Sequence, residues 1–146
     1  MPLVSVGIPV FNGGRFLREC LGSILGQTYP HLEVVVCDNA STDDTWEILA
    51  GISDSRLRVF RNEANIGPFP NWNRCMAESR GEFVAVFHAD DVYEPDIVKE
   101  EVEFLLSHPG AGAVFAGANL IDEDGRPTGK TNLPPLFSGG GLFGFG

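Results

Sequence analysis

Three aspartates in this 146-residue sequence follow apolar runs, where they could bind a ligand. Asp38 follows the run 32–37, and the adjacent pair Asp90 and Asp91 follows the run 82–87. A carboxylate at the mouth of a crevice accepts a hydrogen bond from a base or a ribose. Adjacent carboxylates can also hold Mg²⁺ or Mn²⁺, whose other positions take phosphate oxygens. These residues therefore predict a site for a phosphorylated ligand.

Each of these aspartates also has a purely structural interpretation. Asp90 and Asp91 could cap a helix that begins near Pro95, and on their own the two interpretations have about equal weight. Asp38 by itself is typical of a turn, and Asp43 and Asp44 are expected to cap the helix that follows them. The three histidines are isolated, and the sequence has no Ser-His-Asp order, cysteine pair or Walker lysine motif.

The elements that would position these carboxylates alternate along the chain. Apolar runs predict strands, and four-residue periodicity predicts helices. Strands are expected at 3–10, 32–37, 57–60, 82–87 and 113–121, and helices at 15–27, after 41–44, at 71–79 and at 95–107. This order predicts an α/β fold, a mostly parallel sheet with helices on both faces. Ligands bind such sheets outside the carboxyl ends of the strands, where the three aspartates fall.

Composition restricts the function classes. Ten Lys and Arg against 20 Asp and Glu give a net charge of −10, which argues against nucleic-acid binding and implies that an anionic ligand needs a cation. Cys20, Cys37 and Cys75 lie in apolar stretches and are expected to pack in a reducing compartment. Residues 1–10 lack a signal-peptide pattern, and we expect a cytoplasmic location.

Several motifs occur together in a fixed order. The sequence VSVGIPVFN at 4–12 precedes LGSILGQTY at 21–29 and EVVVCDNASTDDT at 33–45. Asn65-x-Gly67, Asn73, GEFVAVF at 81–87 and ADDVYEPD at 89–96 follow. Over about residues 3–125 this pattern closely resembles family 2 inverting glycosyltransferases of the GT-A fold, which is Rossmann-like. The resemblance implies sugar transfer with inversion from a UDP- or dTDP-sugar to an unknown acceptor.

The resemblance also implies roles for four residues in nucleotide binding. Pro9 and Phe11 match the loop after the first strand, which shelves the base of the donor. Asp38 matches the aspartate that accepts a hydrogen bond from a pyrimidine N–H. Asn73 matches a helix position near the donor diphosphate, although a surface position on the helix is nearly as compatible with its pattern.

A divalent cation, Mg²⁺ or Mn²⁺, is implied at the acidic pair. Asp90 and Asp91 match the DxD-like motif, with Asp91 as the metal ligand and Asp90 beside the ribose or the metal. The family often has a third aspartate where this chain has His88. We therefore expect a site with less negative charge and weaker metal binding.

Two alternatives to a complete transferase remain open. The general base and much of the acceptor site are expected outside the matched region, so the chain could be a nucleotide-binding module without transfer activity. An unrelated nucleotidyltransferase is disfavoured because no basic loop lies near Asn12. We expect a donor-binding domain at 1–130 and a Gly- and Phe-rich tail at 131–146, the start of an acceptor-side half. The tail could mediate a homodimer, and membrane contact is expected only through an acceptor or through further regions.

Overall fold

The computed structural model describes residues 1–130. The chain divides into two compact units, one comprising Met1–Asp96 and the other beginning at Ile97. The tail predicted at 131–146 lies outside the described residues, as does any dimer contact through it. Every candidate site residue from the sequence lies in the first unit.

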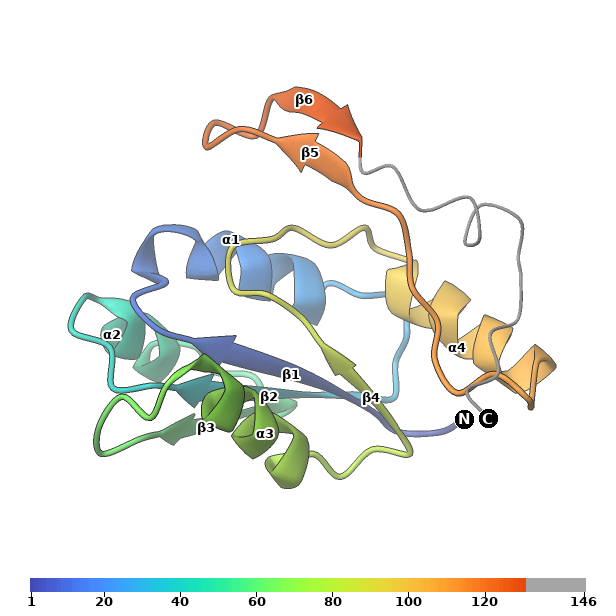
Figure 1. Ribbon diagram of the computed structural model, residues 1–146, viewed down its shortest axis with the longest axis horizontal. Helices are drawn as coiled ribbons and strands as arrows, with labels where there is room; N and C mark the ends of the chain where they lie inside the picture. The colour runs from blue at the N-terminus through green and yellow to red at the C-terminus, as the bar shows by residue number, and fades with distance from the viewer. Residues whose placement is uncertain (131–146) are drawn as a thin grey trace. The chain divides into compact units, whose positions relative to one another are not determined.

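The first unit is an open parallel sheet with helices on both of its faces. Its elements are β1 (Val4–Val10), α1 (Gly14–Leu25), β2 (Leu32–Asp38), α2 (Thr45–Ala50), β3 (Leu57–Arg61), α3 (Pro68–Glu78) and β4 (Phe83–Val86). The four strands are parallel, in the order β3-β2-β1-β4. Figure 1 shows α1 and α3 on opposite faces of the sheet. The α/β fold with a parallel sheet is thus confirmed.

The core follows from this double covering. All seven residues of β2 are buried because the strand has neighbours on both edges and helices over both faces. Helix α1 contributes Leu17, Leu21 and Ile24, whose four- and three-residue spacing places them on one stripe. The three cysteines are buried and free, which confirms that they pack as small hydrophobic residues.

Helix α3 begins earlier than its sequence pattern predicted. We expected this helix at 71–79, but it starts at Pro68. Proline is accepted in the first helical turn because the N–H groups of that turn have no partner within the helix. Gly67 precedes the helix with a φ of 89°, a conformation in which glycine carries no side-chain penalty.

The second unit corrects one expectation. It contains α4 (Ile97–Ser107) and an antiparallel hairpin of β5 (Asn119–Ile121) and β6 (Pro127–Lys130). The prediction that 113–121 forms a fifth strand of the parallel sheet is wrong. The turn at Asp122–Gly125, closed by a 3.0 Å bond from Gly125 N to Asp122 O, reverses the chain directly after β5. Among residues 1–130, no helix is long and apolar enough to cross a bilayer.

Candidate functional site

The carboxyl ends of β1, β2 and β4 meet at one edge of the sheet. Strand β1 lies between β2 and β4, so the chain leaves β1 toward one side and later returns to its other side. Open α/β sheets bind ligands where the strand order reverses in this way. Asp38 is the last residue of β2, and the segments that follow β1 and β4 carry Phe11 and the pair Asp90 and Asp91.

Pro9 marks the point where β1 and β4 separate. The pairing of β1 with β4 ends at Gly7, whose carbonyl accepts a hydrogen bond from Phe87 N at 2.9 Å. The backbone N and C=O groups of successive strand residues point alternately to the two neighbouring strands. The nitrogen of Pro9, like the carbonyl of Gly7, therefore points toward β4, beyond the last residue of β1 that pairs with β4. Its missing N–H therefore costs no sheet bond. Phe11 follows, with 48% of its surface exposed beside this opening.

Asp38 is fully buried at the end of β2 and keeps one oxygen without a hydrogen bond. Its Oδ1 accepts from Ser41 N at 3.0 Å. Its Oδ2 forms an ion pair with Arg61 Nε at 3.2 Å, but the geometry is not that of a hydrogen bond, and no other described group bonds this oxygen. A buried oxygen without a hydrogen-bond donor lowers the stability of the fold unless a ligand supplies that donor.

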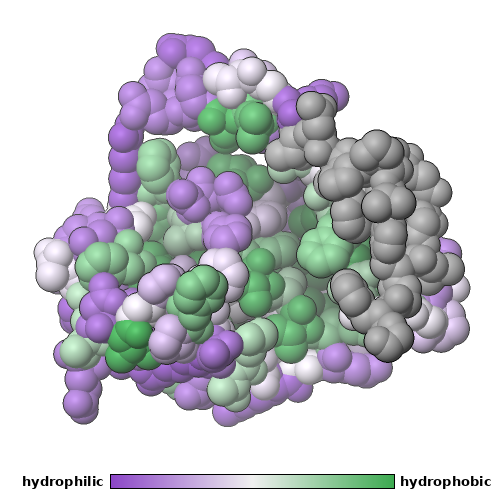
Figure 2. All heavy atoms as spheres, viewed as in Figure 1, coloured by the Kyte–Doolittle hydropathy of each residue, from purple (hydrophilic) through white to green (hydrophobic). Residues whose placement is uncertain are grey.

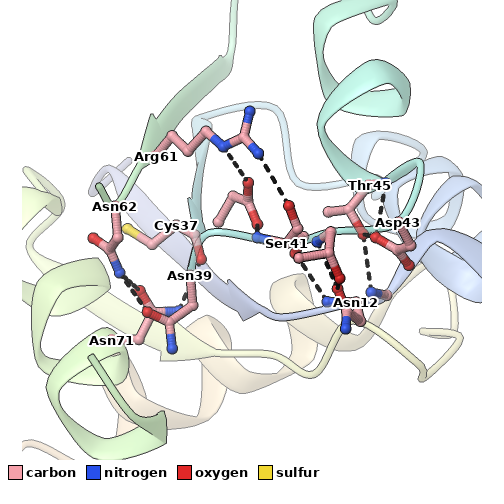
Figure 3. A network of polar contacts seen from close by, with 12 residues as sticks. Asn12, Cys37, Asn39, Ser41, Asp43, Thr45, Arg61, Asn62 and Asn71 are labelled. Atoms are coloured by element: carbon pink, nitrogen blue, oxygen red, sulfur yellow. Dashed lines mark hydrogen bonds and ion pairs between the residues drawn. The ribbon is translucent and has the colours of Figure 1, made fainter. Parts of the chain in front are cut away.

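Arg61 is a candidate site residue that was not predicted from the sequence. Its Nη2 donates to Ser41 O at 3.0 Å (Figure 3). Its guanidinium lies 4.9 Å from the centre of the Trp46 ring. These contacts hold a cation next to the Asp38 carboxylate at the end of β3. The net charge of −10 gave the only hint, since it implied that an anionic ligand needs a positive charge nearby.

The loops after β1 and β2 are tied together. Asn12 N donates to Ser41 Oγ at 2.9 Å, and Asn12 Oδ1 accepts from Thr42 N at 2.8 Å. Asn12 and Ala40 have backbone φ values of 52° and 61°, which residues other than glycine rarely adopt. Strained backbone of this kind, held by neighbouring bonds, concentrates at functional sites.

The N-terminus of α1 is already occupied by a carboxylate of the protein. Asp43 Oδ2 accepts from Gly14 N at 3.0 Å, while its Oδ1 accepts from Thr45 N and Oγ1. Burial raises the pKa of Asp43, but these hydrogen bonds outweigh it and lower the pKa overall. Asp43 thus joins α1 to α2, whereas the side chain of Asp44, the N-cap of α2, makes no capping bond to the described chain. The capping prediction is therefore wrong for Asp44.

Three buried asparagines connect β2, β3 and α3, and we call them the asparagine cluster: Asn39, Asn62 and Asn71. Asn62 Nδ2 donates to Asn39 Oδ1 at 2.7 Å and to Asn71 Oδ1 at 2.9 Å (Figure 3). Asn71 Nδ2 donates to Cys37 O at 2.8 Å. The sequence analysis assigned no role to these residues. Asn73, two positions along α3, is exposed.

Hydrogen bonds and a stacked ring pair hold the turn that carries Asp90 and Asp91 in place. His88 N donates to Tyr93 Oη at 2.8 Å, and the Tyr93 ring stacks on Phe87 with centroids 3.8 Å apart. Cys20 Sγ donates to His88 O at 3.2 Å. Burial, and then the charges of the two aspartates, raise the pKa of the Cys20 thiol to about 12, so it stays protonated as a donor.

The two aspartates themselves are exposed, as a site for a hydrated cation requires. They are the only adjacent carboxylates at this strand end, and no group of three or more His, Cys, Asp or Glu ligands occurs in the part of the chain described. Mg²⁺ is commonly held by one or two carboxylates together with phosphate oxygens. This donor set therefore fits a cation that is completed by a substrate.

Aromatic and apolar residues border this turn. The Trp72 and His88 rings lie edge to face with centroids 5.4 Å apart, and the Phe69 and Trp72 rings lie edge to face with centroids 6.2 Å apart. Trp72, Met76 and Val84 are at least one-third exposed, and Figure 2 shows apolar side chains at the surface over α3 and β4. His88 therefore contacts an aromatic ring at the position where a third aspartate was considered.

The comparisons with known proteins identify the family. The open parallel sheet with carboxylates at its strand ends is that of a GT-A transferase domain, and the family model "Glycosyl transferase family 2" matches residues 5–141. The chain belongs to this family. TuaG of Bacillus subtilis, named for teichuronic acid biosynthesis, is 33% identical over 131 residues, covering 88% of this chain and 52% of TuaG.

Other relatives are named for their substrates. The Escherichia coli UDP-Glc:α-D-GlcNAc-diphosphoundecaprenol β-1,3-glucosyltransferase WfaP is 29% identical over 143 residues, covering 97% of this chain and 56% of WfaP. The chain thus spans about half the length of these curated relatives.

Two solved structures share the fold. Staphylococcus aureus TarS with UDP-GlcNAc has a TM-score of 0.69 and 32% identity over 73% of this chain and 32% of TarS. The Pyrobaculum calidifontis mannosyltransferase PcManGT with GDP-Man and Mn²⁺ has a TM-score of 0.70 and 30% identity, covering 76% and 34%.

Proposed function

We propose that this chain binds the nucleotide and the metal of a UDP- or dTDP-sugar for a glycosyl transfer that inverts the anomeric carbon. The observation that carries the proposal is the buried Oδ2 of Asp38, which has an ion-pair partner but no hydrogen-bond donor among residues 1–130. It lies at the carboxyl end of β2, beside the strand-order reversal where α/β sheets bind ligands.

The state of the two Asp38 oxygens favours a pyrimidine base. Ser41 N donates to Oδ1, so Oδ2 is the carboxylate oxygen that lacks a hydrogen bond. Uracil and thymine present a single ring N–H between two carbonyl groups, which one acceptor satisfies. Guanine presents two adjacent donors, an N–H and an amino group, which suit a carboxylate with both oxygens available. We therefore propose UDP or dTDP rather than GDP, with Pro9 and Phe11 forming the shelf for the base.

The phosphate side of the site is assigned to three residues. Asp91, with Asp90 beside it, would hold Mg²⁺ or Mn²⁺ as the DxD-like motif, and Asn73 would donate its amide N–H to a phosphate oxygen. When bound, the cation stabilises the negative charge of the departing diphosphate. The α1 N-terminus does not take this role, because Asp43 already accepts its Gly14 N–H.

The acceptor hydroxyl would attack the anomeric carbon on the face opposite the diphosphate, and a carboxylate base would take its proton. The resemblance to the family implies that this base lies beyond the matched region, and we place it outside residues 3–125. A nucleotide-binding module without transfer activity is the second candidate function. Sugar transfer by the chain to any acceptor would exclude it.

Calorimetric titration with UDP, dTDP and GDP, each with Mn²⁺ or with EDTA, tests the proposal. We expect UDP and dTDP to bind in Mn²⁺, GDP to bind at least about tenfold more weakly, and all three to weaken in EDTA. Equal affinity for GDP would refute the assignment of the base, and equal affinity in EDTA would refute the metal assignment.

Three further proposals concern the surroundings of the protein. They are a cytoplasmic location, membrane contact only through an acceptor or further regions, and a homodimer through the tail at 131–146. Sedimentation of the chain with and without residues 134–146 tests the homodimer. Self-association that is unchanged by the deletion would refute it.

A further inference from the structure

The side chain of Asn71 connects the two segments that carry the proposed nucleotide-binding residues. Asn71, 2% exposed, donates from α3 to the carbonyl of Cys37, the residue directly before Asp38. Asn73, assigned to the diphosphate, is two residues further along the same helix. One hydrogen bond of 2.8 Å thus connects the backbone that carries the base-binding carboxylate to the helix that carries the phosphate-binding amide.

The rest of the asparagine cluster fixes the start of this helix. Asn39 Oδ1 accepts from Ile66 N at 3.0 Å, and Asn39 Nδ2 donates to Asn65 Oδ1 at 2.8 Å and to Gly67 O at 3.2 Å. The loop that leads into α3 is therefore bonded to the residue directly after Asp38. The two ends of the connection flank Asp38 in the sequence.

Asp38 itself does not depend on these bonds. Its carboxylate is held by Ser41 N and Arg61, and its backbone lies in the register of β1 and β3. Loss of an asparagine amide would thus leave the base-binding group in place and release the helix. The packing beneath the helix is close, since a Cβ at Gly7 would lie 3.0 Å from Cys75 Cβ, which limits the movement to small shifts.

We propose that the asparagine cluster positions α3 relative to Asp38, so that one rigid spacing matches the distance from the base to the diphosphate. Asn62 and Asn71 are positioning residues in this account and do not touch the ligand. The inference rests on the proposed function. It implies that the cluster contributes to binding of a nucleoside diphosphate but not to binding of the nucleoside alone.

The test compares UDP with uridine as ligands of the Asn71→Leu variant, by calorimetry for UDP and by ligand-observed NMR for uridine. Leucine has a similar shape but cannot donate to Cys37 O. We expect UDP affinity to fall about tenfold and uridine affinity to stay within about twofold of the unsubstituted chain. Asn71→Leu should have no further effect when Asn73 is already alanine, because the phosphate contact is then absent.

Equal losses for uridine and UDP, or the full loss in the Asn73→Ala background, would overturn the inference and leave Asn71 with a structural role only. If neither Asp38→Ala nor Asn73→Ala weakens UDP binding, the proposed function itself is wrong. Asn65→Ala provides a second variant if Asn71→Leu fails to fold. Asn65 is exposed, and its loss removes the acceptor of Asn39 and of Gly67 N, so the same difference between UDP and uridine is expected.

Discussion

Replacing Asp38 by asparagine changes one atom of the proposed base-binding group. The amide oxygen can still accept from Ser41 N, as Oδ1 does at 3.0 Å. The amide nitrogen would then take the place of Oδ2, which lies 3.2 Å from Arg61 Nε. Two donors would face each other there, and a ring N–H of a base would meet a donor instead of an acceptor.

The contacts of Asp38 set the expected magnitudes. The Arg61 side chain is 41% exposed and can turn toward water, so we expect a stability loss of about 1–2 kcal/mol, below the 3–5 kcal/mol of a fully buried pair. A hydrogen bond to a charged group contributes about 1.5–3 kcal/mol. Losing it should weaken UDP binding about 10- to 150-fold. Binding should therefore suffer more than stability.

Calorimetry with UDP and Mn²⁺, beside thermal unfolding of the same samples, measures both quantities. Asp54→Asn is the matched control, because Asp54 also pairs with an arginine, with Asp54 Oδ2 2.8 Å from Arg56 Nη2. That pair precedes β3 and lies at the opposite end of the strand from Arg61. We expect Asp54→Asn to leave UDP affinity unchanged. UDP binding by Asp38→Asn within about twofold of the unsubstituted chain would refute the role of Asp38.

The other predictions concern stability. Burial raises the pKa of Glu33, but hydrogen bonds from Ser5, Arg80 N and Arg58 lower it overall. The contribution of Glu33 to the free energy of unfolding is therefore complete above the ordinary glutamate pKa of about 4.3 and is lost as the pH falls through the lower pKa of the folded state. Urea unfolding between about pH 6 and 3 should show this loss, and Glu33→Gln should reduce the slope. Arg61→Met should lower the free energy of unfolding by about 1–3 kcal/mol, because it leaves a buried carboxylate without its cation; an unchanged urea midpoint would contradict this. Gly14→Ala should destabilise the chain, because the added Cβ would lie 1.8 Å from a carboxylate oxygen. Gly22→Ala should stabilise α1 by about 0.5–1 kcal/mol, because the added Cβ would meet no described atom outside the helix backbone within 4 Å. Equal melting temperatures for these two variants would contradict the packing argument.

The sheet could be predicted from the sequence where burial leaves a continuous signal. Strands β1 and β2 are mostly apolar because neighbours and helices enclose them, and α1 shows its buried stripe every three or four residues. The short segment 113–121 is also apolar, yet only its last three residues form a strand, and that strand pairs in an exposed hairpin. Apolar composition alone does not specify a strand's partner.

Some residues of the candidate site could likewise be predicted from the sequence, and others could not. Asp38, Asp90 and Asp91 could be singled out because each follows an apolar run, a position that the sequence shows directly. Their supports come from distant segments and could not be read from local pattern. Arg61 reaches Asp38 only because β3 pairs with β2, and Cys20 reaches the acidic turn across 68 residues.

Backbone amide NMR of the chain titrated with UDP and Mg²⁺, followed by a trace of Mn²⁺, tests the central claim most directly. We predict shifts at Phe11, Asp38 and Asn73, and paramagnetic broadening by Mn²⁺ that is strongest at Asp90 and Asp91. Shifts confined to other parts of the chain, or broadening that leaves the amides of Asp90 and Asp91 unaffected, would contradict it.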